Sequence, residues 1–101
     1  MNYKMWFNNG DVTDGNANKV VLFGDVIRIT YPGYGGTIRL KDIDSMIVYD
    51  ADDVDIYDKR KLIEKKNVCK ILIKDNETVL YVNKMRNEYT HGEYRKIVMC
   101  G

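Results

Sequence analysis

One pair of segments, separated by only two residues, constrains the fold of this chain most strongly. Val20–Phe23 and Val26–Tyr31 are both rich in β-branched and aromatic residues, and Gly24 and Asp25 lie between them. A glycine at the first central position of a two-residue loop suits a type II′ turn, whose twist matches that of two antiparallel strands. The sequence therefore predicts a β-hairpin over residues 20–31.

Other short segments also have the composition of strands, and they are residues 1–7, 37–40, 45–49, 68–74 and 78–82. Turn-forming residues separate most of them. Residues 8–18 are dense in Asn, Asp and Gly, which predicts a turn-rich loop. Residues 32–36 contain one proline and three glycines and should interrupt the second strand of the hairpin.

The charged segment at residues 50–66 leaves two alternatives open. Its acids come first and its bases follow, an order that complements the dipole of a helix. Its apolar residues form only a rough stripe, so a short helix and a charged hairpin loop both fit. In either form it would be an insertion between strands. Near the C-terminus, a short closing helix over residues 93–99 competes with a final strand.

These segments together predict the fold class. A chain of 101 residues has the usual length of one domain, so we expect a single domain over residues 1–101. We expect a mainly β (α+β) fold with about six to seven antiparallel strands and one or two short helices. A small, partly closed barrel or a sandwich is the usual solution for such strands.

Two consecutive segments resemble a known family. They are Val26-Ile27-Arg28-Ile29-Thr30-Tyr31 and Thr37-Ile38-Arg39-Leu40-Lys41-Asp42-Ile43-Asp44-Ser45-Met46-Ile47. Their apolar spacing, in which a strand turns a corner into the next strand, resembles that of the bacterial pleckstrin-homology-like domains over residues 20–82. The resemblance implies a binding or assembly module without catalytic residues, and a C-terminal helix that plugs the barrel.

Residues with catalytic or metal-binding chemistry are few. His91 is the only histidine and Ser45 the only serine, and Ser45 has no Gly-x-Ser-x-Gly context. Two cysteines and one histidine cannot supply the four ligands of a structural zinc site. The acidic run at residues 50–55 lacks the glycine of a calcium-binding loop. We therefore expect no enzyme activity, no metal site and no cofactor.

The charges are distributed unevenly along the chain. Residues 1–58 hold five Lys/Arg and ten Asp/Glu, whereas residues 59–101 hold eleven and five. Such a dipolar surface can steer a charged partner, or its two halves can neutralise each other within the monomer. The isoelectric point near 7.7 is well below that of typical nucleic-acid-binding domains, so we do not expect a nucleic acid partner.

These observations favour a non-enzymatic binding module that acts through a protein–protein surface, with self-association as a further option. A phage- or mobile-element-encoded inhibitor of a bacterial host system fits this description. The alternative is a small-ligand or nucleotide-sequestering protein. The candidate partner-binding residues are the loop aromatic and the charges of the insertion: Tyr34, Asp52, Asp53, Asp55, Lys59, Arg60 and Lys61. No apolar run approaches the ~20 residues of a membrane span, and we expect a cytoplasmic protein.

The hairpin generates a first test at Gly24. A β-branched side chain is strongly disfavoured at positive φ, so Gly24→Val should lower the free energy of unfolding by about 1 kcal/mol or more. Thermal melting followed by circular dichroism measures the change. A variant that melts at the wild-type temperature would rule out the type II′ turn.

Overall fold

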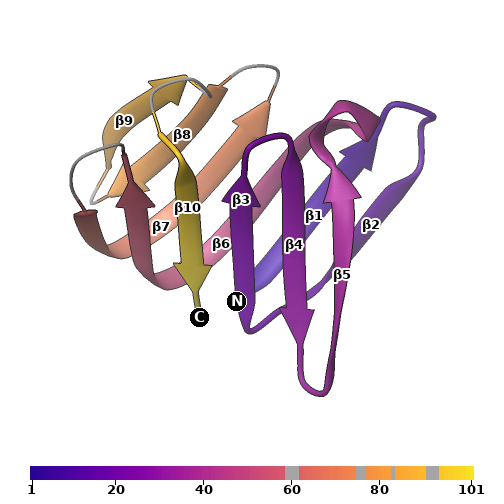
Figure 1. Ribbon diagram of the computed structural model, residues 1–101, viewed down its shortest axis with the longest axis horizontal. Helices are drawn as coiled ribbons and strands as arrows, with labels where there is room; N and C mark the ends of the chain where they lie inside the picture. The colour runs from indigo at the N-terminus through magenta and orange to yellow at the C-terminus, as the bar shows by residue number, and fades with distance from the viewer. Residues whose placement is uncertain (59–61, 75–76, 83, 91–93) are drawn as a thin grey trace.

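The computed structural model describes residues 1–58, 62–74, 77–82, 84–90 and 94–101, and these form one antiparallel sheet of ten strands (Figure 1). The strands are β1 (Asn2–Phe7), β2 (Val12–Asn16), β3 (Lys19–Phe23), β4 (Val26–Tyr31), β5 (Tyr34–Arg39), β6 (Ile43–Tyr57), β7 (Leu62–Lys74), β8 (Glu77–Val82), β9 (Met85–Thr90) and β10 (Lys96–Cys100). A single 3-10 turn, η1 (Leu40–Asp42), precedes β6. The described residues contain no α-helix.

The long strand β6 organises the sheet. Along one side it pairs with β7 in a constant register, from Ser45↔Lys74 to Tyr57↔Leu62. Along its other side the partner changes, because β1 pairs with residues 43–49 and β10 pairs with residues 53–57. Asp50, between these two stretches, has a positive φ of 54°. The sheet continues from β10 through β3 and β4 to β5, and from β7 through β8 to β9.

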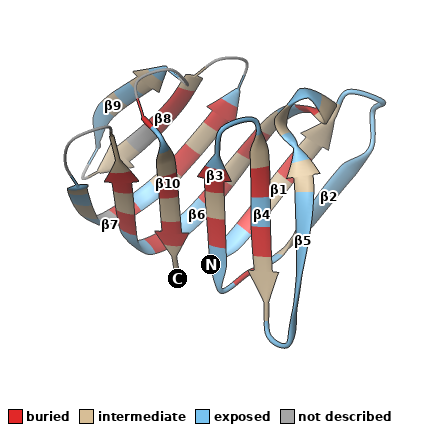
Figure 2. Ribbon diagram, in the orientation of Figure 1, coloured by how far each residue is buried: buried red, intermediate tan, exposed pale blue. Residues whose placement is uncertain are grey.

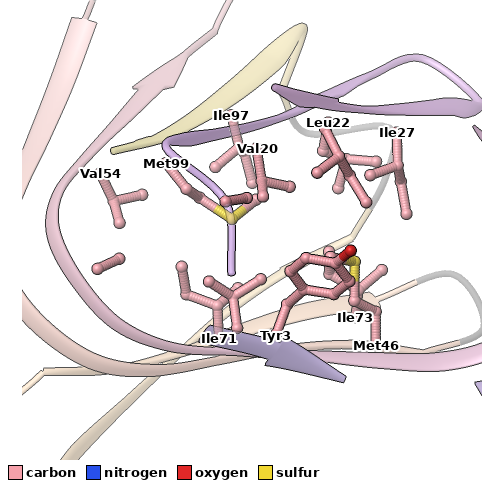
Figure 3. Packing of buried hydrophobic residues seen from close by; sticks show 14 of the residues in the cluster. Tyr3, Val20, Leu22, Ile27, Met46, Val54, Ile71, Ile73, Ile97 and Met99 are labelled. Carbon is pink, nitrogen blue, oxygen red and sulfur yellow. The ribbon is translucent and has the colours of Figure 1, made fainter. Parts of the chain in front are cut away.

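The core lies inside the bend that β6 makes. In Figure 3 the side chains of β3, β4 and β10, among them Leu22 and Ile97, face those of β1, β6 and β7, among them Met46 and Ile71. These four side chains are fully buried. Burying each aliphatic side chain of this size stabilises a fold by roughly 1.5–3 kcal/mol. The sheet therefore bends back over its own apolar face.

The predicted hairpin is confirmed. β3 and β4 pair from Phe23↔Val26 to Lys19↔Thr30, and Gly24 has a φ of +60° whereas Asp25 does not have a positive φ. This combination is the one that a type II′ turn requires.

The predicted interruption at residues 32–36 is shorter than expected. Only Pro32 and Gly33 form the connection, with Gly33 at a φ of +83°. Proline then glycine at these two positions suits a type II turn. Gly35 and Gly36 belong to strand β5, where they pair with Thr30 and Ile29.

The expectation that residues 8–18 form a loop is wrong in its second half. Asn9 and Gly10 do form a turn, in which the Asp11 amide donates to Oδ1 of Asn9 (2.9 Å). Residues 12–16 then form β2 along the free side of β1. β2 is short and mostly exposed, so a polar sequence suffices for it.

Of the two alternatives for the charged segment, the helix is absent from its described residues. Residues 50–57 and 62–66 continue β6 and β7, and Ile56 pairs across the strands with Ile63. The cross-strand register places Asp53 beside Lys66, a pair of opposite charges, but also Asp55 beside Glu64, a pair of like charges. Residues 59–61 lie outside the described residues.

At the C-terminus the strand alternative is the correct one. Lys96–Cys100 form β10, which inserts between β3 and β6 and buries Ile97 and Met99. The chain is therefore mainly β, as expected, but with more strands than the six to seven predicted and with no α-helix among the described residues. The sheet does not close into a barrel.

A transmembrane helix is likewise not found in the described part of the chain.

The bend at Asp50 provides the second test. A non-glycine residue with left-handed backbone angles costs roughly 1–2 kcal/mol, and a β-branched residue costs more. We expect Asp50→Val to lower the free energy of unfolding by about 1–2 kcal/mol and Asp50→Gly to leave it unchanged or raise it. Urea unfolding followed by circular dichroism measures both variants. Equal stabilities of the valine and glycine variants would show that the bend does not require a positive φ.

Candidate functional site

Strand β5 is the most open element of the sheet. It ends the strand path and pairs only with β4, and five of its six residues are exposed (Figure 2). Tyr34 at its start has 68% of its surface exposed. An edge strand of this kind presents backbone donors and acceptors to any chain that lies alongside it.

The other two edges of the sheet carry charges along their strands, whereas the single charge of β5, Arg39, lies at its end and is paired with Asp42. On β9, Arg86 forms salt bridges with Glu88 (2.5 Å) and with Glu77 of β8 (3.6 Å). On β2, the short strand carries Asp14 near its middle. Charged side chains protect natural edge strands against adding a further strand. β5 has no charged residue between Tyr34 and Ile38.

The outward-facing backbone groups of β5 follow from its register. The Leu40 amide donates to the Asp25 carbonyl (2.7 Å), which continues the ladder between β4 and β5. Because hydrogen-bonded pairs alternate in an antiparallel ladder, the even-numbered residues bond to β4. The N–H and C=O groups of Gly35, Thr37 and Arg39 therefore face the open edge.

A hollow of about 500 Å³ lies at the end of β5. Its lining comes from the β1–β2 turn, from β5 and from η1, and comprises Phe7, Asn8, Asn9, Thr37, Ile38, Arg39 and Asp42. Asn8 fixes the turn against η1, since its backbone N–H donates to the backbone carbonyl of Asp42 (3.0 Å). The hollow thus combines two apolar side chains with a salt bridge between Nε of Arg39 and Oδ2 of Asp42 (3.1 Å).

The core-facing side of β5 also has room beside this hollow. Ile38 pairs with the buried Ile27, so Gly36, two residues before it, points the same way. A Cβ atom built on Gly36 would meet no atom within 4 Å. The space next to the edge therefore extends along the strand from Ile38 towards Tyr34.

Three tyrosines anchor the other end of β5 to the core. The hydroxyl groups of Tyr3 and Tyr31 form a hydrogen bond between β1 and β4, and the ring of Tyr31 stacks on that of Tyr34 with 4.7 Å between centroids. Burial, and then the hydrogen bond from Tyr31, raise the pKa of Tyr3 well above its ordinary value. The exposed ring of Tyr34 is therefore supported by the half-buried ring of Tyr31, which is itself held by the buried Tyr3.

The structure separates the residues that the sequence singled out. Tyr34 lies on β5, whereas Asp52, Asp53 and Asp55 lie on β6. Asp53 pairs with Lys66 of β7 and with Cys100 of β10, so it belongs to the middle of the sheet rather than to an insertion. The cations Lys59, Arg60 and Lys61 lie outside the described residues. No group of three or more metal-ligating side chains occurs among the described ones.

Sequence reasoning missed most of the β5 edge. Gly35 and Gly36 were expected in a turn. Phe7 and Ile38, the apolar residues of the hollow, were expected in strands but were not identified as binding residues. The uncharged run from Tyr34 to Ile38 is visible in the sequence. It becomes informative only once the strand is known to be an edge, which depends on the pairing of distant strands.

Comparisons of this chain with protein-family models, with curated proteins and with solved structures found no match.

The tyrosine cluster predicts a loss of stability at high pH. Because the folded state holds the pKa of Tyr3 above its ordinary value near 10, this residue stabilises the fold below about pH 10 and loses that contribution as the pH rises further. Tyr3→Phe should lower stability at neutral pH but show a smaller further loss between about pH 9 and pH 11. Urea unfolding across this range is the measurement, with Tyr34→Phe as the exposed control. If the stability of Tyr3→Phe fell with pH as steeply as that of the wild type, Tyr3 would not be the cause of the loss at high pH.

Proposed function

We propose that this protein is a binding module that takes up an extended segment of a partner protein as an additional strand along β5. The observation that carries the proposal is an exposed edge strand that is uncharged from Tyr34 to Ile38 and ends beside a partly apolar hollow. Addition of a strand to a sheet edge is a recurrent mode of peptide recognition.

The backbone of β5 would supply the affinity in this mode. Gly35, Thr37 and Arg39 offer their N–H and C=O groups at alternate positions, and a partner strand would bond to all three. The missing side chain of Gly35 also leaves the edge unobstructed on the outer side of the sheet. Each such hydrogen bond contributes about 0.5–1.5 kcal/mol net, so several are needed for useful binding.

Side-chain selectivity would come from the two ends of the strand. At one end, the hollow between Phe7 and Ile38 suits an aliphatic or aromatic side chain. At the other end, the supported ring of Tyr34 offers a flat surface for a second apolar group. Arg39 is already paired with Asp42, so the proposal does not require a charged partner segment.

The broader expectations drawn from the sequence stay predictions. A non-enzymatic, cytoplasmic binding module agrees with a recognition site made of backbone and apolar groups. The resemblance to pleckstrin-homology-like domains, the role as an inhibitor of a bacterial host system and the alternative of small-ligand binding are among these predictions. The glycine-rich segment lies mostly in β5 rather than in a loop before a helix, so it does not resemble a phosphate-binding loop.

A peptide library tests the proposal. Panning random linear peptides displayed on phage against the purified protein should enrich sequences with an apolar residue, and binding should shift the NMR amide signals of Gly35, Thr37 and Arg39. Thr37→Pro removes the backbone N–H of residue 37, which faces the open edge. The variant should still fold, because an edge strand tolerates proline at a position whose N–H faces outward. We expect at least about tenfold weaker binding in this variant.

Thr37→Val is the matched control, because it changes the same side chain but keeps the backbone N–H, and it should bind within about twofold of the wild type. Enriched peptides that shift signals elsewhere, or that bind Thr37→Pro as tightly as Thr37→Val, would show that β5 is not the site.

A further inference from the structure

The strands β4, β3, β10 and the end of β6 have a second, uncovered face. They form the layer nearest the viewer in Figure 1, and no other part of the described chain lies in front of them. Because side chains alternate along a strand, the residues between the buried ones point outward from this layer. We call this surface the outer face, and it consists of Lys19, Val21, Phe23, Val26, Arg28, Thr30, Asp53, Asp55, Tyr57, Lys96, Val98 and Cys100.

The middle row of the outer face has an ordered sequence of charges. Cross-strand pairing aligns Arg28 with Val21, Val21 with Val98, and Val98 with Asp55. The row therefore reads cation, apolar, apolar, anion from β4 to β6. The salt bridges between described residues involve neither Arg28 nor Asp55, so both charges are available.

The neighbouring row adds apolar surface. It aligns Val26 and Phe23 with Lys96 and Tyr57, and Phe23 has 55% of its surface exposed. Nζ of Lys96 lies 4.7 Å from the centre of the Tyr57 ring. Phe23 and the half-buried valines Val21, Val26 and Val98 lie next to one another on this face, so their apolar surface is contiguous.

We propose that the outer face is the interface of a homodimer. A two-fold axis that runs along the strands between β3 and β10 brings β4 of one copy over β6 of the other, and β3 over β10. Arg28 then faces Asp55 of the second copy, and Val21 faces Val98 of the second copy. In the next row Phe23 faces Lys96 of the second copy, an arrangement that allows a cation–π contact.

A second copy is the occupant that the charges select. An isologous interface requires a surface that is complementary to itself. The middle row of the outer face meets this requirement because Arg28 and Asp55 lie at equal numbers of strands from the proposed axis. A partner with an acidic or a basic surface would match only one half of the face. The proposal is independent of peptide binding, since neither Arg28 nor Asp55 lies on β5.

The size of the face sets the expected affinity. Four strands, spaced about 4.8 Å apart, make a face smaller than the ~800 Å² per partner of a standard interface. A face below this standard size favours a weak, concentration-dependent dimer over a permanent one.

Sedimentation equilibrium over a concentration series, up to about 1 mM, tests the proposal. The wild type should pass from monomer to dimer. Arg28→Asp and Asp55→Arg each place like charges opposite one another, so each should weaken the dimer at least about tenfold. The double variant Arg28→Asp/Asp55→Arg restores opposite charges across the axis and should return to within a few-fold of the wild type.

Two controls separate the interface from the fold. Asp14→Arg makes the same change on β2, away from the outer face, and should dimerise like the wild type. Circular dichroism should give similar melting temperatures for all variants, because Arg28 and Asp55 form no ion pair among the described residues. A wild type that stays monomeric throughout would overturn the proposal, as would single variants that dimerise normally or a folded double variant that stays monomeric.

Discussion

The rest of the structure depends on one strand that keeps a single partner on one side while it exchanges partners on the other. β6 pairs with β7 at eleven positions between Ser45 and Tyr57, all in one register, and this long ladder holds the two parts of the sheet together. On its opposite side the partner changes from β1 to β10. The first residue of β1, Asn2, pairs with Tyr49 before Asp50, and the last residue of β10, Cys100, pairs with Asp53 after it. The positive φ of Asp50 lets β6 bend there without losing its register with β7. Because β6 bends, the β10–β3–β4 layer lies over β1 and β7, and the apolar residues of both are buried together.

The bend also determines which surfaces remain for function. A sheet that folds over itself without closing keeps free edges and one uncovered face on each layer. In this chain the free edge at β5 is uncharged from Tyr34 to Ile38, and the uncovered face of the β10–β3–β4 layer combines apolar residues with a cation and an anion in one row. Both proposals follow from this geometry: the edge suits an extended segment of another protein, and the face suits a second copy of the chain.

Local signals in the sequence predicted local structure well. The β3–β4 hairpin could be predicted because Gly24 and Asp25 determine the turn and the flanking residues are rich in β-branched and aromatic types. The charged segment could not, because Asp53 and Lys66 show their relation only when β6 and β7 are paired, and the same order of charges suits a helix. Long-range pairing also decided the C-terminus, where Ile97 and Met99 complete the core from a central strand. For the candidate site, the sequence identified Tyr34, but the hollow beside Ile38 arises from residues about thirty positions apart in the chain and has no local signal.

Amide hydrogen exchange of the free protein, measured residue by residue by NMR, tests the account most directly. The account predicts slow exchange along β6 on both sides of Asp50, because β7 pairs with it throughout. Along β5 it predicts an alternation, with slow exchange at Gly36, Ile38 and Leu40 and fast exchange at Gly35, Thr37 and Arg39. Fast exchange in one half of β6, or equal protection at all positions of β5, would contradict the bent sheet with an open edge at β5.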